Sequence, residues 1–84
     1  MRKSAKRSFK PSVDVLIRII SILTQKRTVG RTLLCLEGHL NYTRASRHLR
    51  WLADKEFIEF VVENGKVKIR LTDRGRNFAD LLLK

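Results

Sequence analysis

The chain has 84 residues, enough for one domain built around one modest hydrophobic core. Hydrophobic residues make up 43% of it, which is typical of a folded domain and argues against a disordered tail. Nineteen Lys and Arg against eight Asp and Glu give a net charge of +11, so the leading partner class is a polyanion and, first of all, nucleic acid.

An anionic membrane is the competing polyanion, but no segment combines a cationic face with a bulky apolar face as a membrane-surface helix requires. Pro11, Asp14 and Arg18 interrupt the first apolar run, and this argues against a signal peptide. We therefore expect no membrane partner and a cytoplasmic, nucleoid-associated location.

Cysteine and histidine usage gives no support for a metal or a cofactor. Cys35 is the only cysteine, which rules out an internal disulfide, and we interpret it as a buried apolar thiol. His39 and His48 have no third ligand type nearby, and His48 falls at the edge of an apolar helix face. Nor does the sequence contain a catalytic motif, so it predicts no enzyme.

The first eleven residues are predicted to form a basic, flexible arm, followed by one domain over residues 12–84. The arm contains no acidic residue, and its cations would follow the phosphates or enter a neighbouring minor groove of bound DNA. These cations are Arg2, Lys3, Lys6, Arg7 and Lys10.

Ser12 is a good N-cap for a first helix over Val13–Gln25, whose apolar residues at 13, 16, 17, 20 and 23 share one face. A second apolar face beside it needs a cover of its own, which suggests a homodimer. The predicted dimer contacts are Val15, Ile19 and Ile22, together with Leu83 near the end of the chain.

Two further helices are expected next. The second runs from about Val29 to Glu37 with Val29, Leu33 and Leu36 inward, and Gly38 stops it. Asn41 then caps a third helix from Tyr42 to about Lys55, with an apolar side formed by Ala45, Leu49, Leu52 and Ala53. Two helices joined by a short Gly-containing turn form a helix-turn-helix.

Asn64-Gly65 between two β-rich runs is a strong signal for a two-residue hairpin turn. The turn fixes the register, pairing Ile58 with Leu71, Phe60 with Ile69 and Val62 with Val67 on one face. On the other face it pairs Glu59 with Arg70, Glu63 with Lys66 and Val61 with Lys68. Thr72 or Asp73 then caps a last helix to about Leu83, with Phe78, Leu81 and Leu82 inward.

Two segments resemble winged helix-turn-helix DNA-binding proteins, particularly the small archaeal and the MarR-like or PadR-like types. Residues 49–58, LRWLADKEFI, are similar to the family pattern L-x-x-L-x-x-K-G-L-I, and residues 71–78, LTDRGRNF, to L-T-x-x-G-x-x-F. Glu56 stands where the family usually has Gly, so the bend there can differ. The resemblance implies an α+β fold of three helices, a two-stranded hairpin wing and a C-terminal helix. It also implies that the third helix enters the major groove and that such regulators often form homodimers.

The predicted DNA contacts fall on three elements besides the arm. On the third helix, helical geometry places Thr43, Arg47 and Arg50 opposite Ala45 and Leu49, flanked by Arg44 and Ser46, which makes a donor-rich face. Tyr42, at the start of this helix, is a candidate for a hydrogen bond to a phosphate. Thr28 and Arg31 would hold the DNA backbone near the second helix. Asn64, Lys66 and Lys68 are the wing candidates.

Each assignment has a structural alternative. The arginine face can be a solvated surface, Tyr42 can pack over the turn, and Trp51 is interpreted as packing against the wing rather than stacking on bases. The first functional choice is a sequence-specific transcription regulator that binds double-stranded DNA. The alternatives are an architectural DNA-binding protein and an RNA-binding or protein-binding scaffold.

Overall fold

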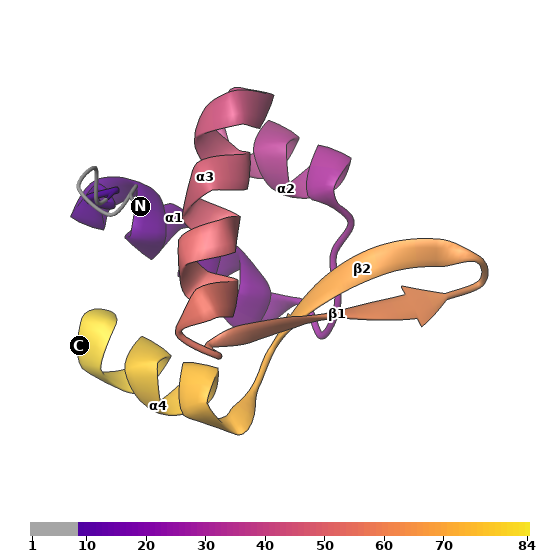
Figure 1. Cartoon of the computed structure of the whole chain (residues 1–84). Coiled ribbons are helices and arrows are strands. Elements are labelled where there is room, and N and C mark those ends of the chain that lie inside the picture. The colour runs from indigo at the N-terminus through magenta and orange to yellow at the C-terminus, as the bar shows by residue number, and fades with distance from the viewer. Residues whose placement is uncertain (1–8) are drawn as a thin grey trace, which may run out of the picture.

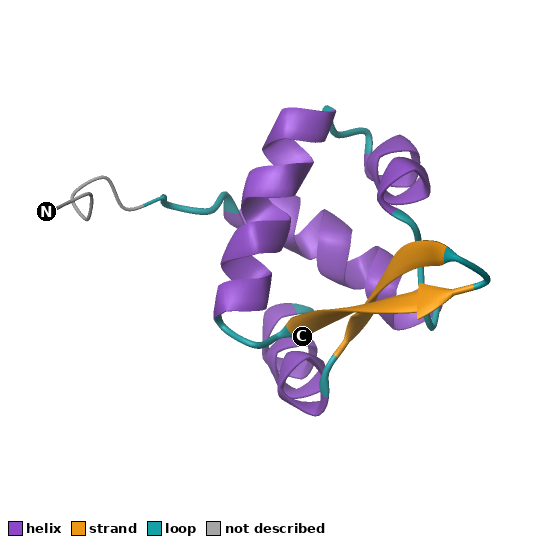
Figure 2. Cartoon of the chain, turned by 45° about the vertical axis from the view of Figure 1, so that its right-hand side comes forward, coloured by secondary structure: helices purple, strands orange, loops and turns teal. Residues whose placement is uncertain are grey.

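The computed structural model describes residues 9–84, and the predicted arm cations at positions 2, 3, 6 and 7 lie outside this range. Four helices and one antiparallel hairpin follow one another in chain order (Figure 1). They are α1 (Val13–Gln25), α2 (Arg31–Gly38), α3 (Tyr42–Asp54), β1 (Ile58–Glu63), β2 (Lys66–Leu71) and α4 (Asp73–Leu82). The fold is therefore the α+β arrangement predicted from the sequence, and Figure 2 shows the hairpin projecting from one side of the helices.

Helix α1 forms the centre of the core. Ser12 caps it as predicted, with its hydroxyl accepting a hydrogen bond from the Val15 N–H. The prediction that Val15, Ile19 and Ile22 form a dimer interface is wrong, because they are only 2%, 0% and 9% exposed within the single chain. Helices α2, α3 and α4 and strand β2 all contact α1, and they cover the second apolar face.

Helix α2 begins two residues later than predicted. Val29 is instead extended and pairs with Ile69 of β2, since each N–H donates to the other residue's carbonyl, at 3.0 and 2.8 Å. The short helix then buries Leu34, whereas Leu33 and Leu36 are exposed, contrary to the prediction. Cys35 is only half-buried.

The turn after α2 also differs from the prediction. His39, not Gly38, adopts the left-handed conformation, with φ of 54°. Gly38 is buried, because the side chains of Leu40 and Ile22 come within 3.2 and 3.5 Å of the position where its Cβ would stand. The glycine therefore serves packing rather than backbone freedom.

Helix α3 begins as predicted, with the Asn41 side chain accepting from the Arg44 N–H at 2.7 Å. At its other end the N–H groups of Glu56 and Phe57 donate to the carbonyls of Ala53 and Leu52, each at 2.9 Å. This is a Schellman ending, which places its left-handed residue at Glu56, with φ of 64°. The position where similar sequences have Gly is thus one where Gly is the favoured residue.

The hairpin has the predicted register at all six pairs, from Ile58 opposite Leu71 to Glu63 opposite Lys66. Asn64 and Gly65 both have positive φ, as a two-residue turn of this kind requires. Only the base of the predicted apolar face is buried, namely Ile58, Ile69 and Leu71. Phe60, Val62 and Val67 are exposed, because the hairpin extends beyond the helices that form the core (Figure 2).

Helix α4 is capped by Thr72, which accepts from the Gly75 N–H at 2.9 Å. A Cβ on Gly75 would stand 1.8 Å from the Phe57 carbonyl oxygen, so the glycine allows α4 to approach the end of α3. Phe57 and Phe78 stack with centroids 4.2 Å apart, and Trp51 packs beside both rings. Trp51 is a packing residue, but its aromatic partners are not on the wing strands. Leu81 is 78% exposed rather than inward.

Candidate nucleic-acid interface

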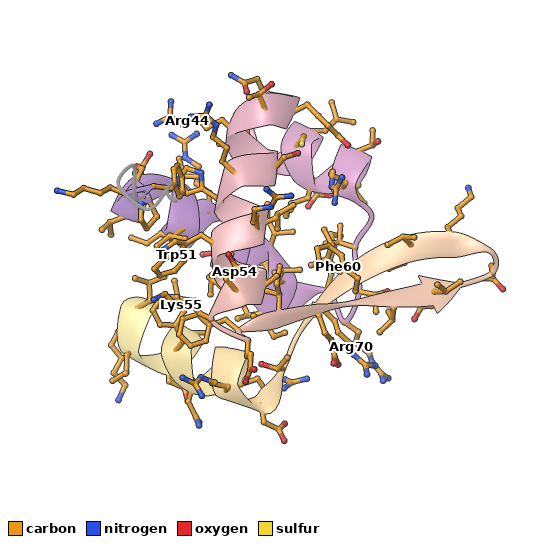
Figure 3. All side chains as sticks on the ribbon, in the orientation of Figure 1. Arg44, Trp51, Asp54, Lys55, Phe60 and Arg70 are labelled. Carbon is orange, nitrogen blue, oxygen red and sulfur yellow. The ribbon has the colours of Figure 1, made fainter. Side chains whose placement is uncertain are left out.

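The outer side of α3 carries a row of exposed donors. Thr43, Arg44, Arg47 and Arg50 are all exposed, on the side opposite the buried Ala45 and Leu49. Figure 3 shows Arg44 near the start of this helix, pointing away from the core. Ser46 differs from its neighbours, since it is half-buried and its Oγ is buried without a hydrogen-bond partner within residues 9–84. Ser46 would have to reorient to contact a base.

These arginines form no salt bridge with any residue in the range 9–84. Within the part of the chain that the structure describes there are three salt bridges, which join Arg18 to Asp14, Lys26 to Glu37 and Arg70 to Glu59. None of these cations belongs to α3. The third pair confirms the expected cross-strand partnership, with a distance of 2.6 Å between Arg70 Nε and Glu59 Oε2.

Arg31, at the start of α2, connects three elements. Its guanidinium donates to the Tyr42 hydroxyl at 2.8 Å and lies 5.6 Å from the centre of the Tyr42 ring and 6.0 Å from that of Phe60. Its Nε is buried and has no hydrogen-bond partner among the described residues. Arg31 therefore holds the first turn of α3 against the wing while one donor remains unsatisfied.

Two hollows flank this arginine. One lies between α3 and β1 and is lined by Arg31, Ser46, Arg47, Arg50 and Phe60, among others. Figure 3 shows the Phe60 ring on the side of the hairpin that faces α3. The other, of about 580 Å³, lies between α2 and β2 and includes Lys66 and Lys68. Cations thus line both hollows, and the one between α3 and β1 also contains the carboxylate of Asp54.

The wing strands pair as predicted, but the side chain of Glu63 has a different partner from the one expected. Glu63 stands opposite Lys66 in the ladder, but its carboxylate accepts a hydrogen bond from the Thr28 hydroxyl at 3.0 Å. No ion pair of Lys66 or Lys68 occurs within residues 9–84. Asn64 is exposed at the tip of the turn, and Thr28 is tied to the wing rather than left free.

The structure adds one residue that the sequence analysis did not assign to the site. His48 of α3 is only 3% exposed, and its ring contacts both the segment before α1 and the backbone of α3. The sequence did contain a signal that His48 is buried, because residues 45, 48, 49 and 52 lie on one side of a helix. The partner residues, 36 and 39 positions earlier in the chain, could not be read from that pattern.

The described residues contain no group of three or more His, Cys, Asp or Glu side chains that could hold a metal ion. In the same part of the chain no helix is long and apolar enough to cross a membrane.

Comparison with solved structures identifies the architecture. A MarR family transcriptional regulator from Silicibacter pomeroyi DSS-3 superposes with a TM-score of 0.73 at 24% identity, covering 86% of this chain and 52% of that one. The DNA-binding protein Sso10a-2 from Sulfolobus solfataricus gives a TM-score of 0.75 at 16% identity, covering 88% of this chain and 76% of that one. The chain thus spans about half the length of the MarR family structure. At these identities the likeness concerns the fold.

Comparison with curated protein sequences gives no significant match. The model of the winged helix-turn-helix family, in contrast, matches residues 6–84, which is almost the whole chain. The matched range includes α3, both strands of the hairpin and α4 with Gly75. The chain belongs to the winged helix-turn-helix family.

Proposed function

We propose that this protein is a sequence-specific transcription regulator that binds double-stranded DNA with α3 in the major groove and the hairpin as its wing. The observation that carries the proposal is the row of exposed donors on α3, which forms no salt bridge within residues 9–84. Arg47 and Arg50 are exposed there, and the salt bridges of residues 9–84 involve other cations. Arginine recognises guanine through two hydrogen bonds to its major-groove edge, so this row can read sequence as well as bind phosphate.

The other elements would bind the DNA backbone. Arg31 lines the hollow between α3 and the wing, and because its unsatisfied Nε is buried, the guanidinium would have to reorient to bind a phosphate there. Lys66 and Lys68 extend the positive surface along β2, and Asn64 lies at the tip. Tyr42 would position Arg31 rather than contact DNA alone, because its hydroxyl already accepts from that guanidinium.

We also propose a homodimer, but not through the core residues of α1. Exposed apolar side chains remain on α1, on α4 and at the residue that follows α4, and the two helices contact each other within the chain. They are Val13, Ile17, Leu81 and Leu83. A two-fold dimer would place two α3 helices about one DNA turn apart and favour a palindromic site. Sedimentation of the wild-type protein and of a Leu81→Lys variant tests this, and a wild-type monomer at micromolar concentration would contradict it.

The decisive experiment is selection from a randomised duplex pool at about 150 mM salt, where non-specific contacts are partly screened, followed by sequencing of the bound fraction. We expect one motif to be enriched. Arg50→Ala should then relax the preference at one or two positions and weaken binding to the selected site by about 1–3 kcal/mol, roughly a 5-fold to 150-fold increase in Kd.

Arg76→Ala is the matched control, since it removes the same charge from an exposed position on α4. It should leave the selected motif unchanged. If Arg50→Ala and Arg76→Ala weakened binding equally and shifted no base preference, α3 would not be the reading element.

The +11 charge supports a second candidate, an architectural protein that coats DNA with little sequence preference. Tight binding without enrichment in the same selection would establish it, and preference for structured RNA would indicate a ribonucleoprotein role instead. Both DNA-binding proposals imply a cytoplasmic, nucleoid-associated location.

A further inference from the structure

The inner side of α3 makes an unusual contact with the segment that precedes α1. His48 is almost fully buried, yet both of its ring nitrogens have backbone partners. Nε2 accepts a hydrogen bond from the Ser12 N–H at 3.0 Å, and Nδ1 donates to the Arg44 carbonyl at 2.8 Å. These partners require the neutral ring with its proton on Nδ1.

A third contact extends this connection toward the predicted arm. The Phe9 ring meets the His48 ring edge to face, with centroids 4.9 Å apart and planes at 89°. Phe9 is half-buried, although it lies in the segment expected to be flexible. Such a pair is an attractive aromatic geometry, so the chain is fixed against α3 at both Phe9 and Ser12.

The place of attachment matters because it lies beside the proposed reading surface. Phe9 and Lys10 line one hollow together with Arg44 and Arg47, and a second one together with Arg47 and Arg50. Lys10 is exposed there. The start of the domain thus borders α3 outside the hollow that this helix shares with Phe60 of the wing.

We infer that His48 is a positioning residue, which clasps Phe9 and Ser12 so that Lys10 and the basic segment before it reach the same DNA duplex as α3. The inference rests on the proposed DNA binding and adds the residue that directs the arm. Without the clasp the arm cations would remain attached to the chain, but their root would no longer be fixed next to Arg44 and Arg47. Ordering them on DNA would then cost more conformational entropy.

The test is the salt dependence of duplex binding by the full chain. Each phosphate contact contributes about 0.9 to the slope of log K against log salt. We expect His48→Leu to reduce the slope by about 0.9 or more, and His48→Gln to restore it, because a carboxamide can both accept from Ser12 and donate to Arg44. His39→Leu, which changes an exposed histidine, is the matched control and should not alter the slope.

A double-mutant cycle distinguishes the positioning role of His48 from a purely structural role. In a protein whose arm cations Arg2, Lys3, Lys6, Arg7 and Lys10 are all replaced by Gln, His48→Leu should have no further effect on the slope. An equal reduction in both backgrounds, or an unchanged slope in a folded His48→Leu protein, would overturn the inference. If His48→Leu fails to fold by circular dichroism, Phe9→Ala serves as the test, with the same expected direction and the same refutation.

The salt-slope experiment tests the role of His48 separately from the proposal of sequence-specific regulation. A wild-type protein that binds duplexes without enriching any motif would refute sequence-specific regulation, while the slopes would still decide the role of His48. Slopes that do not respond to His48 or to Phe9 would refute the clasp even if a motif were enriched.

Discussion

Replacing Glu56 by Gly should make the protein more stable. Glu56 has φ of 64°, a left-handed conformation that costs a residue with a side chain about 1–2 kcal/mol. Its N–H donates to the Ala53 carbonyl at 2.9 Å, and its own carbonyl accepts from the Thr72 hydroxyl at 2.6 Å. Both bonds involve only the backbone of residue 56, so Gly keeps them while removing the strain.

The gain is offset in part, because Gly gives the unfolded chain about 0.4–1 kcal/mol of additional conformational entropy. The expected net stabilisation is about 0.5–1 kcal/mol, which in a domain of this size raises Tm by about 2–8 °C. Thermal unfolding followed by circular dichroism measures it.

Two controls isolate the backbone effect. Glu56→Gln removes the same charge and keeps the side chain, so it should change stability much less than Glu56→Gly. Lys55→Gly, at a right-handed position with φ of −86°, should destabilise the protein by about 0.5–1 kcal/mol. A Glu56→Gly protein that melts at or below the Tm of the Glu56→Gln protein would refute the reasoning from backbone strain.

Two further predictions concern packing and charge. Gly75→Ala should lower stability by about 3 kcal/mol or more and Tm by about 12–24 °C, because the new Cβ would stand 1.8 Å from a backbone oxygen that cannot move freely. Gly30→Ala, whose Cβ would be 3.9 Å from the nearest atom, should change stability by less than about 1 kcal/mol, and equal losses at both glycines would contradict this reading. Lys68→Gln should weaken binding to all duplexes alike and lower the salt slope by about 0.9, whereas a changed sequence preference would show that the wing reads bases.

Local signals in the sequence were sufficient for the starts of α1, α3 and α4 and for the hairpin, but not for the start of α2, which has no side-chain cap. Ser12, Asn41 and Thr72 accept the capping hydrogen bonds expected of them, and the Asn64-Gly65 turn fixed every pair in the hairpin. Each of these features depends on residues close together in the chain. They could be predicted because capping and turn chemistry act over only two or three residues.

The direction of apolar faces was predicted less well. The eight-residue α2 is only about two turns long, so its periodicity allowed Leu33 and Leu36 to be chosen in place of the buried Leu34. Alternation along the hairpin identified one apolar face but not where the core ends, and Val62 and Val67 lie beyond it. Both questions depend on how the elements pack together.

In the candidate site, too, local features could be predicted and features that depend on tertiary packing could not. The exposure of Arg44, Arg47 and Arg50 followed from helical geometry within a single element. The contacts that join Arg31 to Tyr42 and Phe60, and His48 to Phe9 and Ser12, connect residues 11 to 39 positions apart. Such pairs are set by tertiary packing, which a single sequence does not reveal.

These long-range contacts join α3 to the elements around it, and this should affect DNA recognition. Helix α3 is joined to α2 and the wing through Arg31, to the chain before α1 through His48, and to α4 through the region around Phe57 and Gly75. The wing and the root of the arm therefore both contact α3 or residues joined to it, and the wing is held in addition by the contacts of β2 with α1 and Val29. A substitution that tilts α3 would displace both flanking contacts from the DNA at once, so residues inside the domain should affect affinity without touching DNA.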